Sequence, residues 1–167
     1  MSERFEWSIN QMNIQPTDRI LEIGCGHGIA VDLICQTLST GQITAIDRSA
    51  KMVDIAKRRN QVHIDAGHVQ FHTIALEAMD FGEGHFDKIF AINVNLFWQK
   101  PIVEIPIIHR ALRDDGELYL FYQPPHADKA TPILTKVQEH LVANKFAIRE
   151  VVKNHQHQTL IAMIASK

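Results

Sequence analysis

The glycine-rich segment Gly24-Cys25-Gly26-His27-Gly28 has the clearest capacity in this sequence to bind a ligand. Glycines in a turn between a strand and a helix let the backbone approach a ligand closely, and the helix start presents free N–H groups. Dinucleotide-binding turns follow the pattern G-x-G-x-x-G. Here the spacing is G-x-G-x-G, and Ile29 occupies the place of the third glycine, so the case for an NAD cofactor is weakened.

Two acidic residues flank this turn. Glu22 places a negative charge beside it, which would repel a pyrophosphate and attract a ligand that carries ammonium and sulfonium groups. Asp47 ends the next predicted strand, where acids in nucleotide-binding βαβ units accept hydrogen bonds from ribose hydroxyls. The alternatives are that Glu22 meets only backbone or water and that Asp47 only caps the following helix.

Further polar residues follow two later strands. Asn93 and Asn95 are candidates for orienting a polar substrate, with ordinary turn residues as the alternative. Tyr122 and His126 lie after the next strand, and a histidine has the pKa of a general base near neutrality, although a solvated loop histidine is the simpler interpretation. In the segment Phe97-Trp98 we expect an apolar lid over the substrate, core packing, or one residue in each role.

The elements that must position these residues alternate between strands and helices. An amphipathic opening helix is followed by strands predicted at 19–23, 42–47, 69–73, 86–91, 117–122, 146–152 and 159–165. Helices are predicted at 29–38, from an N-cap at Ser49 to about residue 60, at 101–112 with a bend at Pro106, and at 132–144.

This alternation predicts an α/β three-layer sandwich, a mostly parallel, doubly wound sheet with helices on both faces. The last two strands are too close for a helical crossover, so we expect them to pair antiparallel. In such sheets ligands bind beyond the carboxyl ends of the strands, where the strand order reverses. The glycine turn, Asp47 and Asn93 all follow predicted strands.

Composition limits the function classes. The 167 residues are 46% apolar and suit one domain over 1–167, and the net charge of -2 has no basic stripe for a nucleic acid. No segment has the roughly 20 apolar residues of a membrane span, which favours a cytoplasmic protein. Cys25 and Cys35 indicate no disulfide framework, and the ten histidines lack zinc-site spacing, so we expect no metal. The oligomeric state stays open.

The segment Leu21-Glu22-Ile23-Gly24-Cys25-Gly26-His27-Gly28, followed by Ala45-Ile46-Asp47, resembles the first two motifs of class I S-adenosylmethionine-dependent methyltransferases. Three further segments are similar to the family's later ones: Val69-Gln70-Phe71 through Glu77 and Phe81, Phe86-Asp87-Lys88-Ile89, and Arg110-Ala111-Leu112-Arg113-Asp114-Asp115-Gly116-Glu117-Leu118. The resemblance implies a seven-stranded sheet with its last strand antiparallel, S-adenosylmethionine as cofactor and S-adenosylhomocysteine as product.

The resemblance also implies the cofactor-binding residues. They are Glu22, Gly24, Cys25, Gly26, Gly28, Asp47, Arg48, Ala75, Leu76 and Asn93. Ala75 departs from the family's pattern, because an acid that bonds the adenine amino group often stands there. Losing that acceptor should cost about 1 kcal/mol of affinity.

The acceptor is expected to be a small molecule, since the chain has no room for an added substrate domain and lacks the Asn/Asp-Pro-Pro-Tyr signature of related amino-group methyltransferases. Phe5 and Trp7 in residues 1–14 are expected to cover the cofactor or only to dock the first helix on the sheet. Two other functions remain, a non-catalytic S-adenosylmethionine-binding module and, less favoured, an NAD(P)-dependent oxidoreductase.

Overall fold

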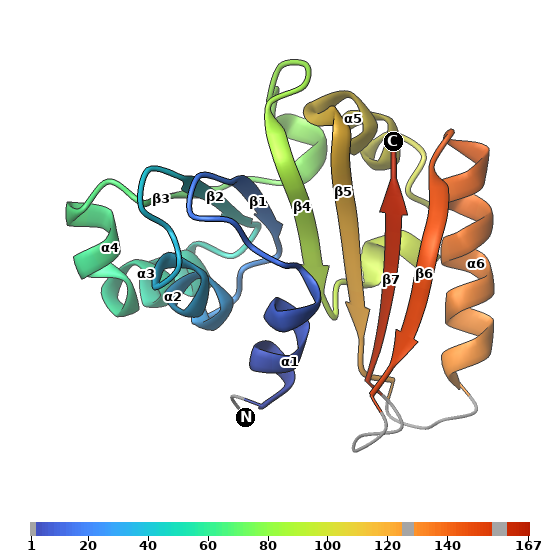
Figure 1. The fold of residues 1–167 in the computed structure, drawn as a ribbon, viewed down its shortest axis with the longest axis horizontal. Helices are drawn as coiled ribbons and strands as arrows, with labels where there is room; N and C mark the ends of the chain where they lie inside the picture. The colour runs from blue at the N-terminus through green and yellow to red at the C-terminus, as the bar shows by residue number, and fades with distance from the viewer. Residues whose placement is uncertain (1–2, 125–128, 155–159) are drawn as a thin grey trace.

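The computed structural model describes residues 3–124, 129–154 and 160–167 and contains one seven-stranded sheet (Figure 1). The strand order is β3-β2-β1-β4-β5-β7-β6. The strand bounds are β1 (Arg19–Ile23), β2 (Gln42–Asp47), β3 (Val69–Thr73), β4 (Phe86–Ile92), β5 (Leu112–Tyr122), β6 (Ala147–Lys153) and β7 (Ile161–Ser166). The first five strands run parallel, and β7 pairs antiparallel with both β5 and β6, as the sequence predicted.

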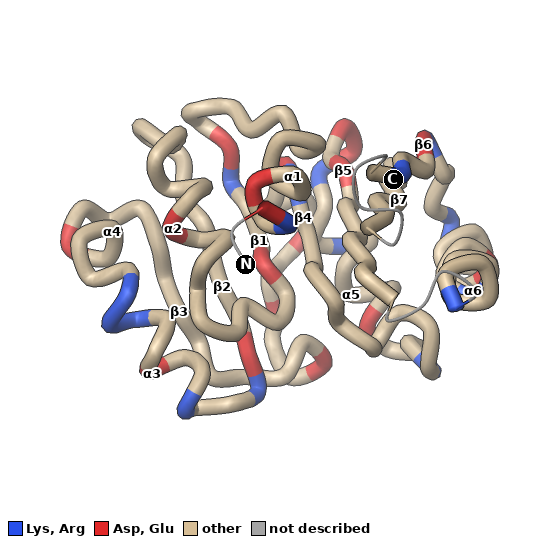
Figure 2. Tube along the Cα trace, turned by 90° about the horizontal axis from the view of Figure 1, so that it is seen from below, with Lys and Arg blue, Asp and Glu red and all other residues tan. Residues whose placement is uncertain are grey.

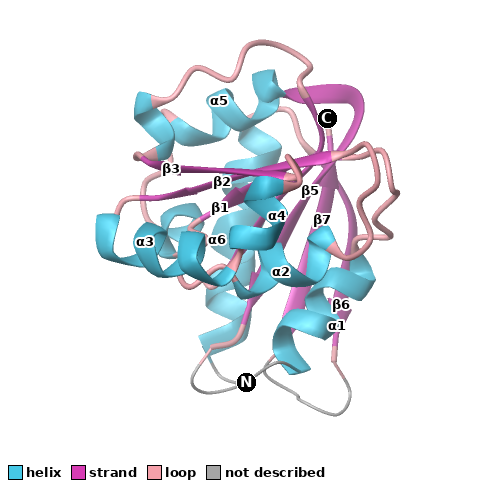
Figure 3. Ribbon diagram, turned by 90° about the vertical axis from the view of Figure 1, so that its left-hand side faces the viewer, coloured by secondary structure: helices cyan, strands magenta, loops and turns pink. Residues whose placement is uncertain are grey.

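Helices cover both faces of the sheet (Figure 3). One face carries α1 (Glu3–Gln11), α2 (Ile29–Cys35), α3 (Ala50–Arg59) and the short α4 (Gln61–Asp65). The other carries α5 (Glu104–Ala111), α6 (Ala130–Ala143) and the 3₁₀ turns η1 (Leu76–Ala78) and η2 (Asn95–Trp98). The central strands are therefore buried on both sides, which is why β1 reads as the almost continuous apolar run RILEI.

The strand order reverses between β1 and β4, since β1 has β2 as its neighbour on one side and β4 on the other. The crossover connections of β1 and β4 leave the sheet in opposite directions, so a crevice opens beyond their carboxyl ends. The glycine turn follows β1, and Asn93 follows β4. The fold thus brings the predicted ligand-binding turns to one edge of the sheet.

Three predicted element bounds were wrong by three residues or more. Helix α5 begins at Glu104 and not at Pro101, and Pro106 lies in its first turn, where no intrahelical partner is needed, so the predicted bend has no cause. Strand β5 begins at Leu112 because a register shift opposite β4 admits extra residues around Gly116. Helix α2 ends at Cys35, three residues before the predicted end.

No helix in the described part of the chain is both long and apolar enough to cross a membrane. Lys and Arg alternate with Asp and Glu around the described chain trace (Figure 2), consistent with the interspersed charges of the sequence.

Candidate functional site

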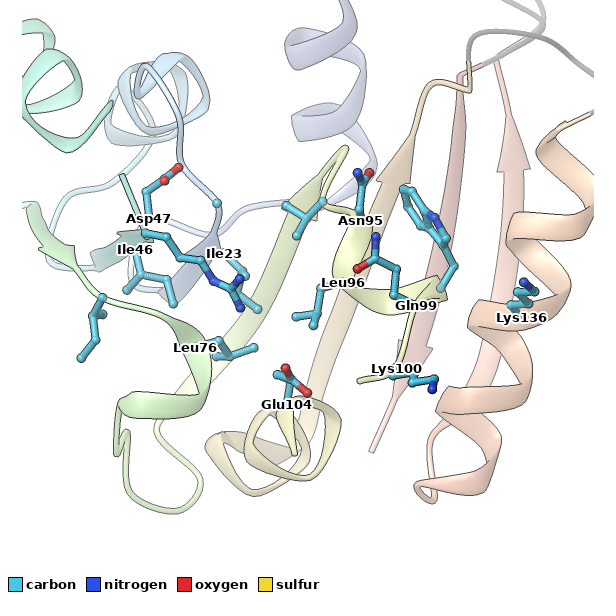
Figure 4. A pocket seen from close by; sticks show the side chains of 15 residues that line it. Ile23, Ile46, Asp47, Leu76, Asn95, Leu96, Gln99, Lys100, Glu104 and Lys136 are labelled. Atoms are coloured by element: carbon cyan, nitrogen blue, oxygen red, sulfur yellow. The ribbon is translucent and has the colours of Figure 1, made fainter. Parts of the chain in front are cut away.

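A cavity of about 930 Å³ lies beyond the carboxyl ends of β1, β2 and β4 (Figure 4). Its wall combines apolar side chains with charged groups from β2, from the segments that follow β2 and η2, and from α5 and α6. The lining residues are Ile23, Gly24, Ile46, Asp47, Arg48, Ile74, Leu76, Val94, Asn95, Leu96, Trp98, Gln99, Lys100, Glu104 and Lys136. A cavity of this size at this edge suits a ligand as large as a nucleoside cofactor together with a small second molecule.

The glycine turn has the backbone conformation that its composition predicts. Gly24, Gly26 and Gly28 have φ values of +75°, +51° and +71°, a region that residues with a side chain enter only at a cost. The N–H groups of Gly24 and Cys25 donate to the Ile46 carbonyl at 2.8 and 3.0 Å, which fixes the turn to β2. A Cβ on Gly24 would lie 2.7 Å from Val94 Cγ2, whereas one on Gly26 would meet nothing within 4 Å.

Asn60, which the sequence analysis did not identify, fixes the far end of the turn. Its side chain is fully buried, and its Nδ2 donates to the carbonyls of Gly28 and Ala56 at 3.0 and 2.9 Å. A Cβ on Gly28 would lie 2.6 Å from this nitrogen. Asn60 follows α3, where an asparagine is an ordinary helix end, so its long-range contact left no signal in the sequence.

Asp47 links the turn to β2. One carboxylate oxygen accepts from the Gly26 N–H and the other from the Ser49 N–H, both at 2.9 Å. The N-cap of α3 is Ser49, whose hydroxyl accepts from Met52 N at 3.3 Å, so capping is not the role of Asp47. A carboxylate has about four acceptor sites, which leaves Asp47 capacity for ligand hydroxyls at the cavity wall.

Glu22 is a buried carboxyl beneath the turn, 2% exposed. Its Oε2 accepts no hydrogen bond from any described residue. Desolvation, followed by the nearby Asp47 charge, holds its pKa well above the ordinary value, so the group favours its neutral form. Burial likewise raises the pKa of the Cys25 thiol, ahead of the effect of Glu22, which makes it a packed and unreactive turn residue.

The segment after β3 forms a second wall of the cavity. Leu76, the first residue of the 3₁₀ turn η1, is 4% exposed and lines the cavity, and Ala75 directly precedes it. Arg48 pairs with Glu77 at 3.1 Å across an exposed surface. The wall is therefore apolar with an ion pair at its outer edge, and Ala75 contributes no side-chain acceptor.

Residues after β4 form the opposite wall. Asn93 is left-handed with φ 56°, and its Oδ1 accepts from the Gln123 N–H at 2.7 Å, which ties the ends of β4 and β5 together. Asn95 and Trp98 line the cavity, whereas Phe97 is fully buried in the core, so the two adjacent aromatic residues take different positions.

Tyr122 lies beneath Trp98, with the two rings 5.0 Å apart edge to face. It is 2% exposed, its hydroxyl has no partner among the described residues, and burial raises its pKa well above the ordinary value. Such a phenol is poorly placed to exchange protons with the cavity. His126 lies outside the described residues, so its predicted role rests on the sequence alone.

Four polar cavity residues were not identified from the sequence, namely Gln99, Lys100, Glu104 and Lys136. The first three follow the Asn93 to Trp98 segment, and that proximity was the available signal. Lys136 lies on α6, far from any motif, and only the tertiary fold brings it to the cavity.

The described residues form no metal site, and helix α1 lies outside the cavity. Among the residues that the structure describes, no cluster of three or more His, Cys, Asp or Glu could hold a metal ion. The Trp7 ring packs edge to face on the Phe121 ring, with 6.2 Å between the ring centroids, and no described residue of α1 lines the cavity. The first helix thus packs on the sheet in this structure, on the face of α2.

Residues 20–116, more than half of the chain, match the sequence profile of the methyltransferase domain family. The uncharacterized methyltransferase YdaC of Bacillus subtilis is 30% identical over 131 residues, 78% of this chain and 70% of that protein. A malonyl-[acyl-carrier protein] O-methyltransferase of Priestia megaterium is 45% identical over 103 residues, 59% of this chain and 34% of that protein.

The fold has counterparts among solved structures. The crystal structure of a SAM-dependent methyltransferase from Aquifex aeolicus has a TM-score of 0.79 and 16% sequence identity, covering 96% of this chain and 88% of that one. At this identity the likeness concerns the fold, including the seven-stranded sheet and its antiparallel last strand.

Proposed function

This chain belongs to the methyltransferase domain family, and on that premise we propose that it binds S-adenosylmethionine and transfers the methyl group to a small molecule. The observation that carries the proposal is the cavity that begins at the glycine turn and Asp47 and continues past Leu76 to Asn95 and Trp98. One end of this cavity has the groups that a nucleoside needs, and the other end remains for an acceptor.

The buried carboxyl of Glu22 fits a cationic amino acid ligand. Its orphaned oxygen lies beneath the turn, and an ammonium group brought to the turn would favour the ionised form that desolvation now disfavours. A pyrophosphate would have the opposite effect, because its negative charge would add to that of Asp47 and further disfavour the ionised form of Glu22. This difference, with the G-x-G-x-G spacing, favours S-adenosylmethionine over NAD(P) and disfavours the oxidoreductase alternative.

We assign the ribose to Asp47 and the adenine ring to the apolar wall at Leu76. The two oxygens of Asp47 are oriented by the Gly26 and Ser49 N–H groups, so they are held in place to accept from vicinal hydroxyls. Ala75 supplies no side-chain acceptor for the adenine amino group, and we retain the expectation that affinity is lower by about 1 kcal/mol for that reason.

The reaction requires alignment more than acid–base chemistry. When bound, the cofactor would supply a methyl group on a good leaving group, so that transfer would form one bond from the acceptor to carbon and break the carbon–sulfur bond, with the electron pair staying on sulfur. The residues of this chain would hold the two partners in line and exclude water. Asn95 and Gln99 offer amide groups to the acceptor, and Glu104 is a cavity carboxylate able to take a proton from one.

Isothermal titration calorimetry with S-adenosylhomocysteine, NAD and NADP tests the cofactor assignment. We expect binding of S-adenosylhomocysteine alone, and uptake of a pyridine nucleotide instead would contradict the proposal. Slow release of S-adenosylhomocysteine from S-adenosylmethionine with an acceptor library separates an enzyme from a non-catalytic binding module. Binding with no turnover on any acceptor would favour the module.

From the sequence we also propose that the protein is cytoplasmic and that residues 1–14 cover the bound cofactor. Deleting residues 1–12 tests the second, since unchanged S-adenosylhomocysteine affinity in a folded variant would dismiss the cover.

A further inference from the structure

The acceptor end of the cavity carries two lysines that pair with no described acid. Lys100 follows η2 and Lys136 lies on α6, and neither forms a salt bridge with any residue in the described ranges. By contrast, the cavity's third cation, Arg48, is neutralised by Glu77 at 3.1 Å. Two ammonium groups without a described counterion thus lie in a part of the wall that also holds Leu96, Trp98 and Gln99.

These lysines lie away from the cofactor end. Figure 4 shows Lys136 on the opposite side of the cavity from Asp47, with Leu96 and Gln99 between them, and Lys100 below Gln99. An anion held by both would therefore be remote from the nucleoside groups. It would anchor the acceptor by a part of the molecule other than its reacting atom.

Glu104 is the carboxylate that lines the cavity near this end, and its position at the start of α5 reduces how far it neutralises the two lysines. It is the first residue of α5, where the helix dipole favours a negative charge, and its Oε2 accepts from the Val103 N–H at 3.2 Å. It makes no salt bridge with either lysine. The acceptor end retains a net positive charge of one when Glu104, Lys100 and Lys136 are counted together.

Apolar side chains lie beside the lysines as well as the polar Gln99 and Glu104. Leu96 and Trp98 line the cavity, and the segment between Lys100 and Glu104 exposes Ile102 and Val103, with relative exposures of 77% and 54%. Exposed large apolar residues beside a binding cavity are typical of a surface that contacts an apolar ligand.

We propose that the methyl acceptor is an amphiphilic small molecule, with an anionic group held between Lys100 and Lys136 and an apolar body against Leu96 and Trp98. This inference rests on the proposed function and specifies the substrate class of the same site. The chemistry is shared by a carboxylate and a phosphate ester, and two lysines suit one such group and not the repeated phosphates of a nucleic acid.

The test is a titration of four ten-carbon probes into the protein saturated with S-adenosylhomocysteine. Decanoate and decyl phosphate represent the two anionic classes, decanol is neutral and decyltrimethylammonium is cationic, all below their micellar concentrations. We expect at least one anion to bind five-fold or more tightly than decanol, with decyltrimethylammonium the weakest. The tighter anion identifies the head group.

One double variant and one control variant locate the effect. Lys100→Gln with Lys136→Gln should lower the affinity for the better anion at least ten-fold and leave decanol unchanged. Lys57→Gln, an exposed lysine of α3 that does not line the cavity, should have no effect. The variants must retain wild-type affinity for S-adenosylhomocysteine, because neither lysine is assigned to the cofactor.

Each failure has a separate meaning. Equal affinity of wild type for decanoate, decyl phosphate and decanol, or an unchanged anion affinity in the double variant, would overturn the acceptor assignment while S-adenosylhomocysteine binding stands. If calorimetry shows no binding of S-adenosylhomocysteine to the wild-type protein before any probe is added, the proposed function is overturned and this inference with it.

Discussion

Alanine substitutions in the glycine turn should separate the folding role of Gly28 from the binding role of Gly26. Both glycines have positive φ, +71° and +51°, so each Gly→Ala change carries a backbone cost of about 1–2 kcal/mol. Their surroundings differ, because a Cβ on Gly28 would contact buried atoms and one on Gly26 would enter open space.

The additional cost at Gly28 follows from its contacts. The new Cβ would lie 2.6 Å from Asn60 Nδ2 and 2.9 Å from Ala56 Cβ, and overpacking of this kind costs about 1–3 kcal/mol. Moving Asn60 would also weaken its two buried hydrogen bonds, at about 1 kcal/mol or more. We therefore expect Gly28→Ala to lower the free energy of unfolding by roughly 3–5 kcal/mol, and Gly26→Ala by about 1–2 kcal/mol.

Binding should follow the opposite order. The methyl group added by Gly26→Ala would enter open space beside the turn, two residues from Gly24, which lines the cavity where we place the cofactor, so this change should weaken S-adenosylhomocysteine binding at least ten-fold. Gly67→Ala is the matched control, because Gly67 has φ +78°, an added Cβ there also meets nothing within 4 Å, and the residue lies before β3, outside the cavity wall. It should match Gly26→Ala in stability and wild type in affinity.

Urea denaturation followed by circular dichroism gives the stabilities, and calorimetry gives the affinities. The reasoning is refuted if Gly26→Ala destabilises the protein as much as Gly28→Ala does. It is also refuted if Gly26→Ala binds S-adenosylhomocysteine as tightly as Gly67→Ala.

Three further predictions concern buried polar groups and a helix cap. Because the pKa of Glu22 is raised, the native state keeps a proton that the unfolded state loses above about pH 4.3, so the free energy of unfolding should fall as pH rises from there toward the folded pKa. Glu22→Gln should remove this fall and raise the melting temperature of the ligand-free protein at pH 8. A lower melting temperature of the variant would contradict the assignment. Lys88 pairs with buried Asp18 at 2.7 Å, so Lys88→Met should lower the free energy of unfolding by about 3–5 kcal/mol, measured by chemical denaturation. Arg110→Met, which breaks the exposed pair with Asp80, is the control and should lower it by under about 1 kcal/mol. Ser49→Ala should cost about 1 kcal/mol through the lost N-cap of α3, and Ser49→Asp should recover it; equal losses in both would show that the cap is not the cause.

Local signals were sufficient for the elements to which we assign the cofactor. The glycine turn, the strand that precedes it and Asp47 carry their own turn chemistry and periodicity, and β1, β2 and β3 have the bounds that the sequence predicts. The antiparallel end of the sheet was confirmed for the same reason, since two β-rich runs joined by a connection too short for a crossover must run antiparallel.

The features that the sequence did not predict depend on contacts between distant segments. Helix α5 starts at Glu104, after Pro101, and Gln99 and Lys100 between η2 and α5 line the cavity, an arrangement that local propensity does not encode. Asn60 and Lys136 become site residues only because α3 packs under the turn and α6 packs on η2. Such residues look like an ordinary helix end and an ordinary solvated lysine until the sheet brings them together.

The most direct test of the central claim is a crystal structure with S-adenosylhomocysteine. We expect ribose hydroxyls within hydrogen-bonding distance of Asp47, the adenine ring on Leu76, the amino acid end at the glycine turn above Glu22, and the sulfur facing the side of the cavity that holds Asn95 and Trp98. A ligand bound elsewhere, or a ribose that does not contact Asp47, would contradict it.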